Sequence, residues 1–287
     1  MTILDALQWA EQKLKGSKEN PKLDAQVLLA SVLDKGTAYL FAHGEDPLPE
    51  EKFTKFQRLV ERRGRFEPVA YLVGHKEFYK REFVVNPHVL IPRPDTEALV
   101  DVALGLLTPQ SLVVDIGTGS GAIALTIAAE TGRPAVAIDA DPRALAVAKL
   151  NADALGLAKR VAFFEGNLLE PLLAESNGEP LGDHLVITAN LPYIAQRQYD
   201  ALEPNVKAYE PKTALVSGID GLDHYDALFA QIAARRFALP KALDVVVEID
   251  PSQKQTAPAL VRSHLPGAHV EVVNDLAGRP RVVVVRC

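Results

Sequence analysis

The stretch SLVVDIGTGSGAIALTIAAE, residues 111–130, decides the fold class. Its first six residues, SLVVDI, form a short apolar run of the kind that builds a buried strand. Glycines at alternate positions follow, and AIALTIAAE then predicts a helix. A buried strand that passes through glycines into a helix is typical of a doubly wound sheet, whose ligand site lies at the carboxyl ends of its parallel strands.

The segments on both sides continue this alternation of strands and helices. The pattern predicts a helix at 95–107, a strand at 134–139, a helix at 142–155, and strands at 161–167 and 184–190. The last residues, 269–287, predict two strands around an Asp-Leu-Ala-Gly turn. We therefore expect an α/β fold with a doubly wound, mostly parallel sheet and an antiparallel edge strand at the C-terminal end.

The first 75 residues have a helical pattern instead. Thr2 and Asp5 match a capping box, and the Asn-Pro pair at 20–21 supplies an N-cap and a proline at the first helical position. A third helix is expected over 49–63. The apolar stripes predicted for the three helices are Leu4, Leu7 and Leu14; Leu23, Val27, Ala30 and Leu33; and Phe53, Phe56, Leu59 and Val60. These helices predict a small bundle.

Between the two patterns, residues 76–90 alternate aromatic or β-branched side chains with polar ones, which indicates a short hairpin. We therefore expect a helical bundle at 1–75, a β-hairpin linker at 76–94 and the α/β domain at 95–287.

The composition excludes several classes of protein. With 48% hydrophobic and 24% charged residues, the chain reads as soluble and globular. A formal net charge of −6 argues against stable binding of nucleic acid, and no apolar run is long enough to span a membrane. The only cysteine is Cys287, which excludes an internal disulfide framework, and the histidines lack metal-binding spacing. No charged-then-apolar leader opens the chain, so we expect a cytoplasmic protein without a metal.

The glycines of the opening stretch predict a ligand site. Because Gly117, Gly119 and Gly121 lack Cβ atoms, backbone N–H groups of the loop can approach a ligand at the helix N-terminus. Asp139 ends the next strand and is suited to accept hydrogen bonds from a ribose diol. The alternative is a tight strand-helix turn beside a surface aspartate.

Two cofactors fit such a loop. Gly117, Gly119 and Ala122 satisfy the relaxed dinucleotide fingerprint, so a nicotinamide cofactor stays open. Asp115 precedes the first glycine at the strand end, where a carboxylate can reach the cationic amino-acid end of S-adenosylmethionine, directly or through water. Gly121 adds a third glycine at alternate spacing, as in the Asp-x-Gly-x-Gly-x-Gly loops of methyltransferases. These features favour S-adenosylmethionine.

The tetrapeptide Asn190-Leu191-Pro192-Tyr193 follows the strand at 184–190 and so lies at the same edge of the sheet. An amide or aniline nitrogen is a poor nucleophile because its lone pair is delocalised, and methylating it requires both N–H bonds to be held. The side-chain oxygen of Asn190 and the carbonyl of Leu191 are suitable acceptors. Pro192 restricts Leu191 to an extended conformation, and Tyr193 can stack on the planar group. The alternative is an ordinary turn after a strand.

The chain contains several blocks that carry a family resemblance. They are GHKEFYKREFVVNPHVLIPRPDTEALV (74–100), DIGTGSGAIAL (115–125), EPKTALVSGIDGLDHY (210–225) and NDLAGRPRVV (274–283). With the tetrapeptide, which is similar to the Asn-Pro-Pro-Tyr signature of amino-methyltransferases, they resemble the HemK/PrmC family of peptide chain release factor glutamine methyltransferases. The signature itself is shared by enzymes that modify adenine N6 and by those that modify glutamine N5.

The resemblance implies a class I S-adenosylmethionine-dependent methyltransferase. Its substrate would be the glutamine N5 in the Gly-Gly-Gln loop of release factors, and the N-terminal bundle would help to engage that protein. The tetrapeptide residues Asn190, Leu191, Pro192 and Tyr193 are the expected catalytic residues. The expected cofactor-binding residues are Asp115, Gly117, Thr118, Gly119, Ser120, Gly121, Asp139, Asn167, Leu168 and Asn190.

The chain departs from the family pattern at three positions. Leu191 replaces the first proline of the signature, Asn167 stands where an acidic residue is frequent, and Asp250 stands where glycine is usual. Because of Asn167, the adenine contact is expected to differ, with Leu168 as the neighbour of the ring.

Further candidates and alternatives stay open. Arg93, Asp95 and Glu97 could lie near the cofactor, although Asp95 also suits a helix N-cap and Glu97 a first-turn charge. Arg58, Arg62, Arg63 and Arg65 form a local basic stripe, which is either a solvated helix end or a partner contact. The rival functions are an adenine-N6 methyltransferase acting on DNA or RNA, and a nicotinamide-dependent oxidoreductase or nucleotide-binding module.

Overall fold

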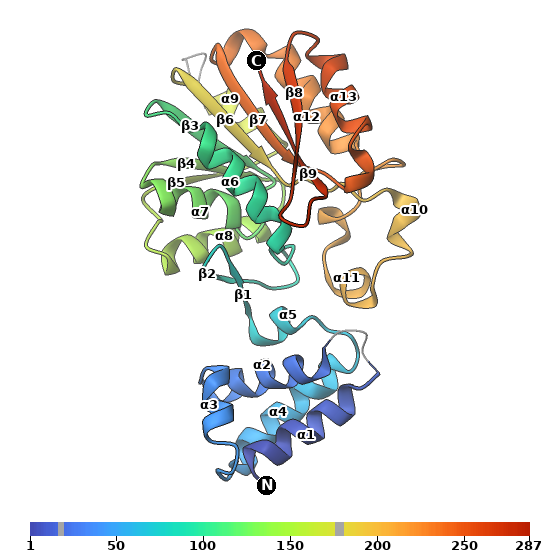
Figure 1. Ribbon diagram of the computed structural model, residues 1–287. Coiled ribbons are helices and arrows are strands. Elements are labelled where there is room, and N and C mark those ends of the chain that lie inside the picture. Colours follow the sequence, from blue (N-terminus) through green and yellow to red (C-terminus); the bar gives the residue numbers. More distant parts are fainter. Residues whose placement is uncertain (17–19, 176–180) are drawn as a thin grey trace. The chain divides into compact units, whose positions relative to one another are not determined.

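The computed structural model describes residues 1–16, 20–175 and 181–287, and the chain folds into two compact units. One unit holds Met1–His75 with Glu203–Tyr209, and the other holds Lys76–Leu202 with Glu210–Cys287. Figure 1 labels the elements of both. The first unit has one hydrophobic core and the second has two.

The first unit is a bundle of helices. Its elements are α1 (Ile3–Leu14), α2 (Pro21–Leu33), α3 (Thr37–Ala42), α4 (Glu50–Arg63), α5 (Val69–Val73) and α11 (Pro204–Tyr209). The predicted helix starts are confirmed, because Thr2 and Asp5 form a capping box on α1 and Asn20 caps α2. The short helices α3 and α5 escape prediction, since five or six residues show little periodicity.

The buried faces of α1 and α2 differ from the predicted stripes. Leu4 and Leu23 are 42% and 51% exposed, so both predicted positions are wrong. Alanines take part in the contacts in their place, among them Ala6 and Ala10 on α1 and Ala25 on α2. Small side chains let two helices approach closely, and a search for large apolar residues passes over them.

The predicted basic stripe at the end of α4 is not a surface feature throughout. Arg63 is 1% exposed, and its Nε donates to Oδ2 of Asp24 on α2 at 2.7 Å. Arg62 is half exposed and pairs with Glu67. The stripe is therefore corrected: one of its arginines forms a buried ion pair that ties α4 to α2.

The second unit is built on a seven-stranded sheet. Its strands are β3 (Ser111–Ile116), β4 (Ala135–Asp139), β5 (Val161–Glu165), β6 (His184–Ala189), β7 (Ala242–Glu248), β8 (His269–Asn274) and β9 (Pro280–Arg286), in the order β5-β4-β3-β6-β7-β9-β8. The five strands from β5 to β7 are parallel, while β9 pairs antiparallel with both β7 and β8. The predicted doubly wound sheet with a C-terminal antiparallel edge is confirmed.

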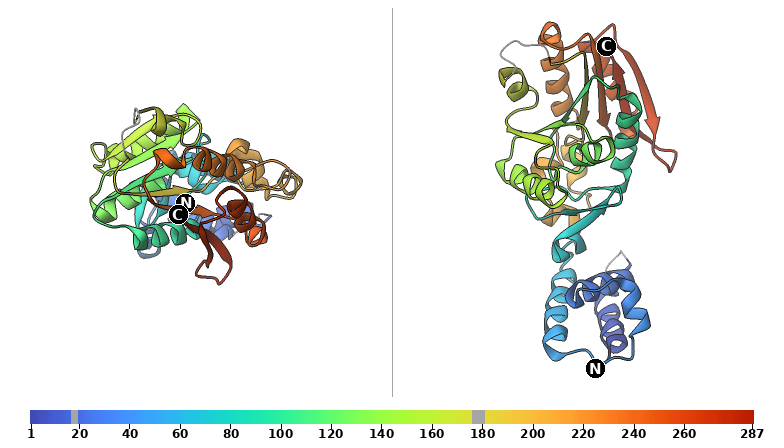
Figure 2. Two further views of the ribbon diagram at one scale, coloured as in Figure 1. Left: turned by 90° about the horizontal axis from the view of Figure 1, so that it is seen from above. Right: turned by 90° about the vertical axis from the view of Figure 1, so that its left-hand side faces the viewer.

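Helices cover both faces of this sheet. α6 (Glu97–Leu106) and α7 (Ala122–Thr131) pack on one face, together with α8 (Pro142–Ala154). α12 (Asp223–Ala234) and α13 (Thr256–His264) pack on the other. Figure 2 shows α6 and α12 on opposite sides of the strands. The central parallel strands β3, β4, β6 and β7 are thereby largely buried, which explains why their sequences are apolar runs rather than alternations. The edge strand β5 is buried only in part.

The remaining elements of the second unit are short. They are the two-stranded hairpin of β1 (His75–Phe78) and β2 (Arg81–Val84), the helices α9 (Glu170–Glu175) and α10 (Gln196–Tyr199), and the 3₁₀ turns η1 (Pro94–Thr96), η2 (Lys212–Ala214), η3 (Arg236–Ala238) and η4 (Pro251–Gln253). The hairpin is confirmed. Tyr79 and Lys80 both have positive φ at its turn, which suits the twist of a tight hairpin. Within the described ranges, no helix is long and apolar enough to cross a membrane.

Replacing Asp24 by alanine leaves Arg63 buried without this partner, and we expect the first unit to lose about 3–5 kcal/mol of unfolding free energy. Trp9 is the only tryptophan and packs against Phe53 and Phe56, so its fluorescence during urea unfolding reports on this unit.

The matched control is Glu51→Ala, which removes one partner of the exposed Lys55–Glu51 pair on α4. We expect that substitution to change the unfolding free energy by less than about 1 kcal/mol. Equal losses in the two variants would contradict a structural role for the buried pair.

Candidate active site

The glycine loop lies at the carboxyl end of β3, where it meets the end of β4. The backbone N–H groups of Gly117 and Thr118 donate to the carbonyl of Ile138 at 2.8 and 3.0 Å, which fixes the loop against β4. Gly117 has a φ of 68°, and a Cβ added there would come within 2.8 Å of Cδ2 of Leu191. At Gly119 a Cβ would meet no atom within 4 Å, so this part of the loop faces open space.

Asp139, at the end of β4, stabilises the glycine loop and the turn before α8 through its carboxylate. Its Oδ2 accepts from the backbone N–H of Gly119 at 2.8 Å, and its Oδ1 accepts from that of Asp141 at 2.9 Å. Burial raises the pKa of this carboxyl, while the hydrogen bonds from the backbone lower it. Each oxygen keeps a further lone pair, so the carboxylate can accept two more hydrogen bonds.

Asp115 takes a position different from the expected one. It is fully buried beneath the loop and does not border the cavity described below. Its two oxygens accept from the hydroxyls of Thr118 and Thr188, at 2.7 and 2.8 Å. Burial raises the pKa of Asp115 to about 6. The carboxylate therefore ties the glycine loop to β6, and its direct contact with a cofactor stays a prediction that this position does not favour.

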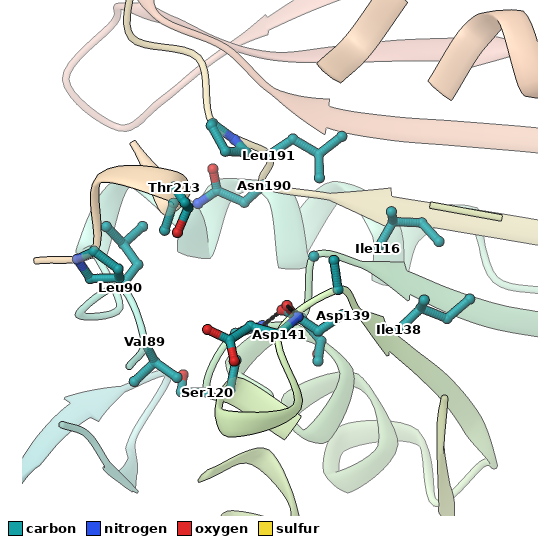
Figure 3. Close-up of a pocket in the computed structure, with 18 of the residues that line it drawn as sticks. Val89, Leu90, Ile116, Ser120, Ile138, Asp139, Asp141, Asn190, Leu191 and Thr213 are labelled. Atoms are coloured by element: carbon teal, nitrogen blue, oxygen red, sulfur yellow. Dashed lines mark hydrogen bonds between the residues drawn. The ribbon is translucent and has the colours of Figure 1, made fainter. Parts of the chain in front are cut away.

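A cavity of about 650 Å³ opens above the loop, and Figure 3 shows part of its lining. Among its lining residues are Gly117, Thr118, Gly119, Ser120, Asp139, Asn167, Leu168, Asn190, Leu191 and Pro192. Most of the expected site residues therefore meet at one cavity of a size usual for small-molecule sites. Gly121 does not border it. A Cβ there would lie 2.8 Å from Leu125, so this glycine allows the loop to pack on α7.

Asn167 and Leu168 border the cavity from the turn after β5. The side-chain amide of Asn167 donates to Glu170 at 3.0 Å. Leu168 adopts a positive φ of 53° and is 8% exposed. Its apolar side chain borders the cavity, and its place beside an adenine stays a prediction.

Asn190 projects into the cavity opposite Asp139 (Figure 3). Its Nδ2 donates to the hydroxyl of Thr96 at 3.2 Å, and its Oδ1 accepts no hydrogen bond within the described part of the chain. The amide is thus held at one end by the protein and keeps an acceptor oxygen for a ligand.

Of the other tetrapeptide residues, Leu191 and Pro192 border the cavity, whereas Tyr193 lies in the core. Leu191 is 5% exposed and packs against Gly117. Its carbonyl oxygen lies 3.5 Å from the hydroxyl of Tyr225, whose shorter partner is the carbonyl of Glu248. Pro192 borders the cavity.

Tyr193 does not border the cavity. Its hydroxyl donates to Oε1 of Glu248 at 3.1 Å, and its carbonyl accepts from Nε2 of Gln253 at 3.0 Å. Burial raises the pKa of the phenol. Tyr193 is therefore anchored in the core, and its stacking on a substrate stays a prediction.

The segment before α6 contributes more to the site than its sequence indicates. Arg93 and Thr96 border the cavity, and Arg93 pairs with the buried carboxylate of Glu210. Asp95 is not the expected N-cap, because it accepts from Arg279 and Arg281 at 3.1 and 2.8 Å. That placement corrects the expectation for Asp95.

Sequence reasoning missed three groups around the cavity. Thr96 reads as part of a helix start, Glu248 ends a strand that the pattern does not predict, and His224 follows a glycine turn. His224 borders the cavity, its Nδ1 lies 2.7 Å from Oγ of Ser217, and burial lowers its pKa. Within residues 1–16, 20–175 and 181–287, no cluster of histidine, cysteine and acidic side chains could hold a metal ion.

Comparison with known proteins identifies similar sequences along the whole chain. Residues 5–74 match the PrmC N-terminal domain, and residues 113–208 match a methyltransferase domain. A release factor glutamine methyltransferase of Bacillus anthracis is 36% identical over 99% of this chain and 98% of its own length. One of Moorella thermoacetica is 39% identical over 98% of this chain and 97% of its own length.

The fold has solved counterparts. The hMettl16 catalytic domain, in complex with MAT2A 3'UTR hairpin 6, has a TM-score of 0.53 at 14% identity, and the match covers 83% of this chain and 81% of that chain. At this identity the likeness shows the fold alone, which is the class I methyltransferase fold expected from the sequence.

The buried carboxyl of Asp115 gives the second unit a testable pH dependence. Its pKa rises from 3.8 in the unfolded chain to about 6 in the folded one, so ionisation between about pH 4 and pH 6 works against folding. Asp115→Asn cannot ionise. Its unfolding free energy, relative to that of the wild type, should therefore rise by about 3 kcal/mol between pH 4 and pH 8.

Urea unfolding followed by circular dichroism at several pH values measures this difference. Asp141→Asn is the control, because Arg143 lowers the pKa of Asp141 and the expected pH trend has the opposite sign. Parallel pH profiles for Asp115→Asn and the wild type would show that Asp115 titrates normally.

Proposed function

The chain belongs to the release factor glutamine methyltransferase family, and from this premise we propose that it methylates the side-chain amide N5 of the glutamine in the Gly-Gly-Gln motif of peptide chain release factors. The methyl donor would be S-adenosylmethionine. The observation that carries the proposal is the single cavity that brings together the glycine loop, Asp139 and Asn190. We further propose a cytoplasmic location, since release factors act in translation.

The residues around the cavity fit this donor. The open space at Gly119 lets a ligand approach the loop backbone, and the free lone pairs of Asp139 suit a ribose diol. Leu168 offers an apolar wall for the adenine. We propose that Gly117 to Ser120, Asp139, Asn167 and Leu168 hold the cofactor, with Gly121 and Asp115 acting through the loop that they shape and anchor. When bound, S-adenosylmethionine supplies a methyl group activated by its sulfonium charge.

The residues at the other side of the cavity are suited to hold the substrate amide. Oδ1 of Asn190 has no partner in the protein among the described residues and can accept one N–H bond of the glutamine amide. The carbonyl of Leu191 is proposed as the second acceptor. Holding both N–H bonds directs the nitrogen lone pair at the methyl group, so catalysis depends mainly on positioning.

The chemistry needs no strong base. As the new bond from carbon to nitrogen forms, the bond from carbon to sulfur breaks, and the nitrogen becomes cationic and strongly acidic. Solvent can then take the proton. His224 borders the cavity and burial lowers its pKa, which favours the neutral imidazole, but the chemistry does not require it as a proton acceptor.

We also propose a division of labour along the chain. The bundle at 1–75 would engage the release factor, the hairpin segment 76–94 would link it to the catalytic domain, and 95–287 would carry out the transfer. The match of residues 5–74 to the PrmC N-terminal domain supports a bundle specific to this family.

For the cofactor, calorimetry should detect binding of S-adenosylmethionine and of its demethylated product, with no binding of NAD. Asp139→Ala should weaken both by about 1.5–3 kcal/mol, because hydrogen bonds to a charged acceptor are lost. Asp153→Ala, an exposed aspartate on α8, serves as the control and should leave affinity unchanged. Micromolar affinity for NAD without affinity for S-adenosylmethionine would end this proposal.

For the substrate, S-adenosylmethionine with a labelled methyl group should transfer its label to a release factor and not to duplex DNA. Asn190→Ala should reduce turnover about 10²- to 10³-fold, since one preorganised polar contact to the reacting group is lost. Asn190→Asp keeps acceptor oxygens and should retain partial activity. Label on DNA alone, or wild-type turnover in Asn190→Ala with normal cofactor affinity, would contradict the assignment.

A further inference from the structure

Two buried polar side chains, those of Thr96 and Glu248, lie close to Asn190. Thr96, at the end of η1, accepts from Nδ2 of Asn190 at 3.2 Å and is 4% exposed. Glu248, the last residue of β7, lies next to Thr96, is 1% exposed and does not border the cavity. Three segments distant in the sequence thus place an amide, a hydroxyl and a carboxylate next to one another.

Charged and polar groups from every neighbouring element face Glu248. Tyr193 donates to its Oε1 at 3.1 Å, and the neighbouring hydroxyl of Thr96 lowers its pKa. Arg281 on β9 also lowers this pKa, whereas Asp95 raises it. Burial has the largest effect, and the pKa of Glu248 is raised overall. Tyr225 on α12 donates to the carbonyl of the same residue.

The carboxylate is not fully satisfied by these contacts. Oε2 of Glu248 is buried and has no hydrogen-bond partner among the described residues. A buried carboxylate is costly, and one with an incompletely paired oxygen is more so. Core packing alone does not explain a buried, incompletely paired carboxylate next to Thr96, the hydrogen-bond partner of Asn190. This placement indicates a role at the site.

The orientation of the Asn190 amide matters for catalysis. The two ends of an asparagine amide have nearly the same shape, so packing does not distinguish them. Only the amide oxygen can accept a hydrogen bond from an N–H group of the substrate. If the amide were reversed, its NH₂ group would face the N–H group of the substrate, and both would be donors. Since Thr96 contacts one end, the direction of the hydrogen bond between them decides which end faces the cavity.

A threonine hydroxyl has a single proton, so its donation to one partner fixes the bond to the other. If Thr96 donates to Glu248, its oxygen must accept from Asn190, and Nδ2 then points to Thr96. If Thr96 donated to Asn190 instead, Oδ1 would turn away from the cavity.

We propose that Glu248 and Thr96 are positioning residues for Asn190: Oε2 of the carboxylate accepts a hydrogen bond from the hydroxyl of Thr96, and Thr96 thereby holds the Asn190 amide with its oxygen toward the substrate. This inference rests on the proposed function, in which Oδ1 accepts an N–H bond of the glutamine amide. Neither residue touches the reacting atoms, and both act through Asn190.

The first test is Thr96→Val in the full-length protein, with a release factor and labelled S-adenosylmethionine. Valine keeps the shape of threonine but removes the hydroxyl. We expect kcat to fall about 10- to 100-fold, the range typical of groups that orient a functional residue, with cofactor affinity and KM for the release factor nearly unchanged. Thr96→Ser restores the hydroxyl and should recover most of the rate.

The matched control is Thr126→Val. Thr126 is also fully buried, lies on α7, and has a hydroxyl without a hydrogen-bond partner in the described ranges. Removing that hydroxyl should therefore change neither rate nor stability much. A loss of kcat in both valine variants would indicate a general packing effect and overturn the positioning role.

The second test is the pH profile of kcat for the wild type and Glu248→Gln. Protonation turns one carboxylate oxygen into a donor that can direct its proton to the oxygen of Thr96, and the hydroxyl proton of Thr96 can then face Asn190. Wild-type kcat should therefore fall as the pH drops through the raised pKa of Glu248. Glu248→Gln should be slower at neutral pH and lack this acid limb. An unchanged limb in the variant would overturn the role of Glu248.

The outcomes separate this inference from the proposed function. A wild-type protein that labels no release factor refutes the proposed function itself. A wild type that labels release factor, accompanied by Thr96→Val with wild-type kcat, refutes the inference alone.

Discussion

The close approach of Leu191 to Gly117 is the constraint on which the site depends. A side-chain methyl of Leu191 occupies the space that a Cβ of residue 117 would need, and the two contacts lie at the ends of the neighbouring strands β6 and β3. The glycine loop after β3 and the Asn190–Tyr193 segment after β6 are therefore in direct contact. A Cβ at position 117 would have to displace that methyl group, and the φ of 68° also disfavours residues other than glycine there.

Local signals in the sequence predict most of what this constraint requires. The apolar strands, the glycines after β3 and the polar residues after β6 are contiguous motifs, and the parallel sheet brings their ends together without further information. The sequence fails for β7, α12 and α13, where no turn or cap signal stands out. It also fails for α1 and α2, because alanines make contacts that hydrophobic patterning assigns to leucines such as Leu4 and Leu23.

The second part of the site could not be predicted, because it consists of contacts between distant segments. Among the described residues, the side chain of Thr96 makes no hydrogen bond within its own helix start, and its contact with Asn190 forms only when the fold brings the two segments together. Glu248 is similar, since a glutamate in an apolar strand gives no hint of which groups surround it. A motif shows which residue can accept a hydrogen bond, whereas the tertiary structure decides whether that acceptor is oriented.

Two buried carboxylates follow the same physical rule at the two halves of the site. Asp115 at the end of β3 is held by two threonine hydroxyls, and Glu248 at the end of β7 lies beside one. Burial raises the pKa of both carboxyl groups, so the charged form of each is less favourable than it would be in an exposed acid. A hydroxyl can donate or accept a hydrogen bond, but next to a carboxylate, which only accepts, it must donate. Each of these two carboxylates lies beside hydroxyls next to residues that line the cavity, and neither carboxylate borders the cavity itself.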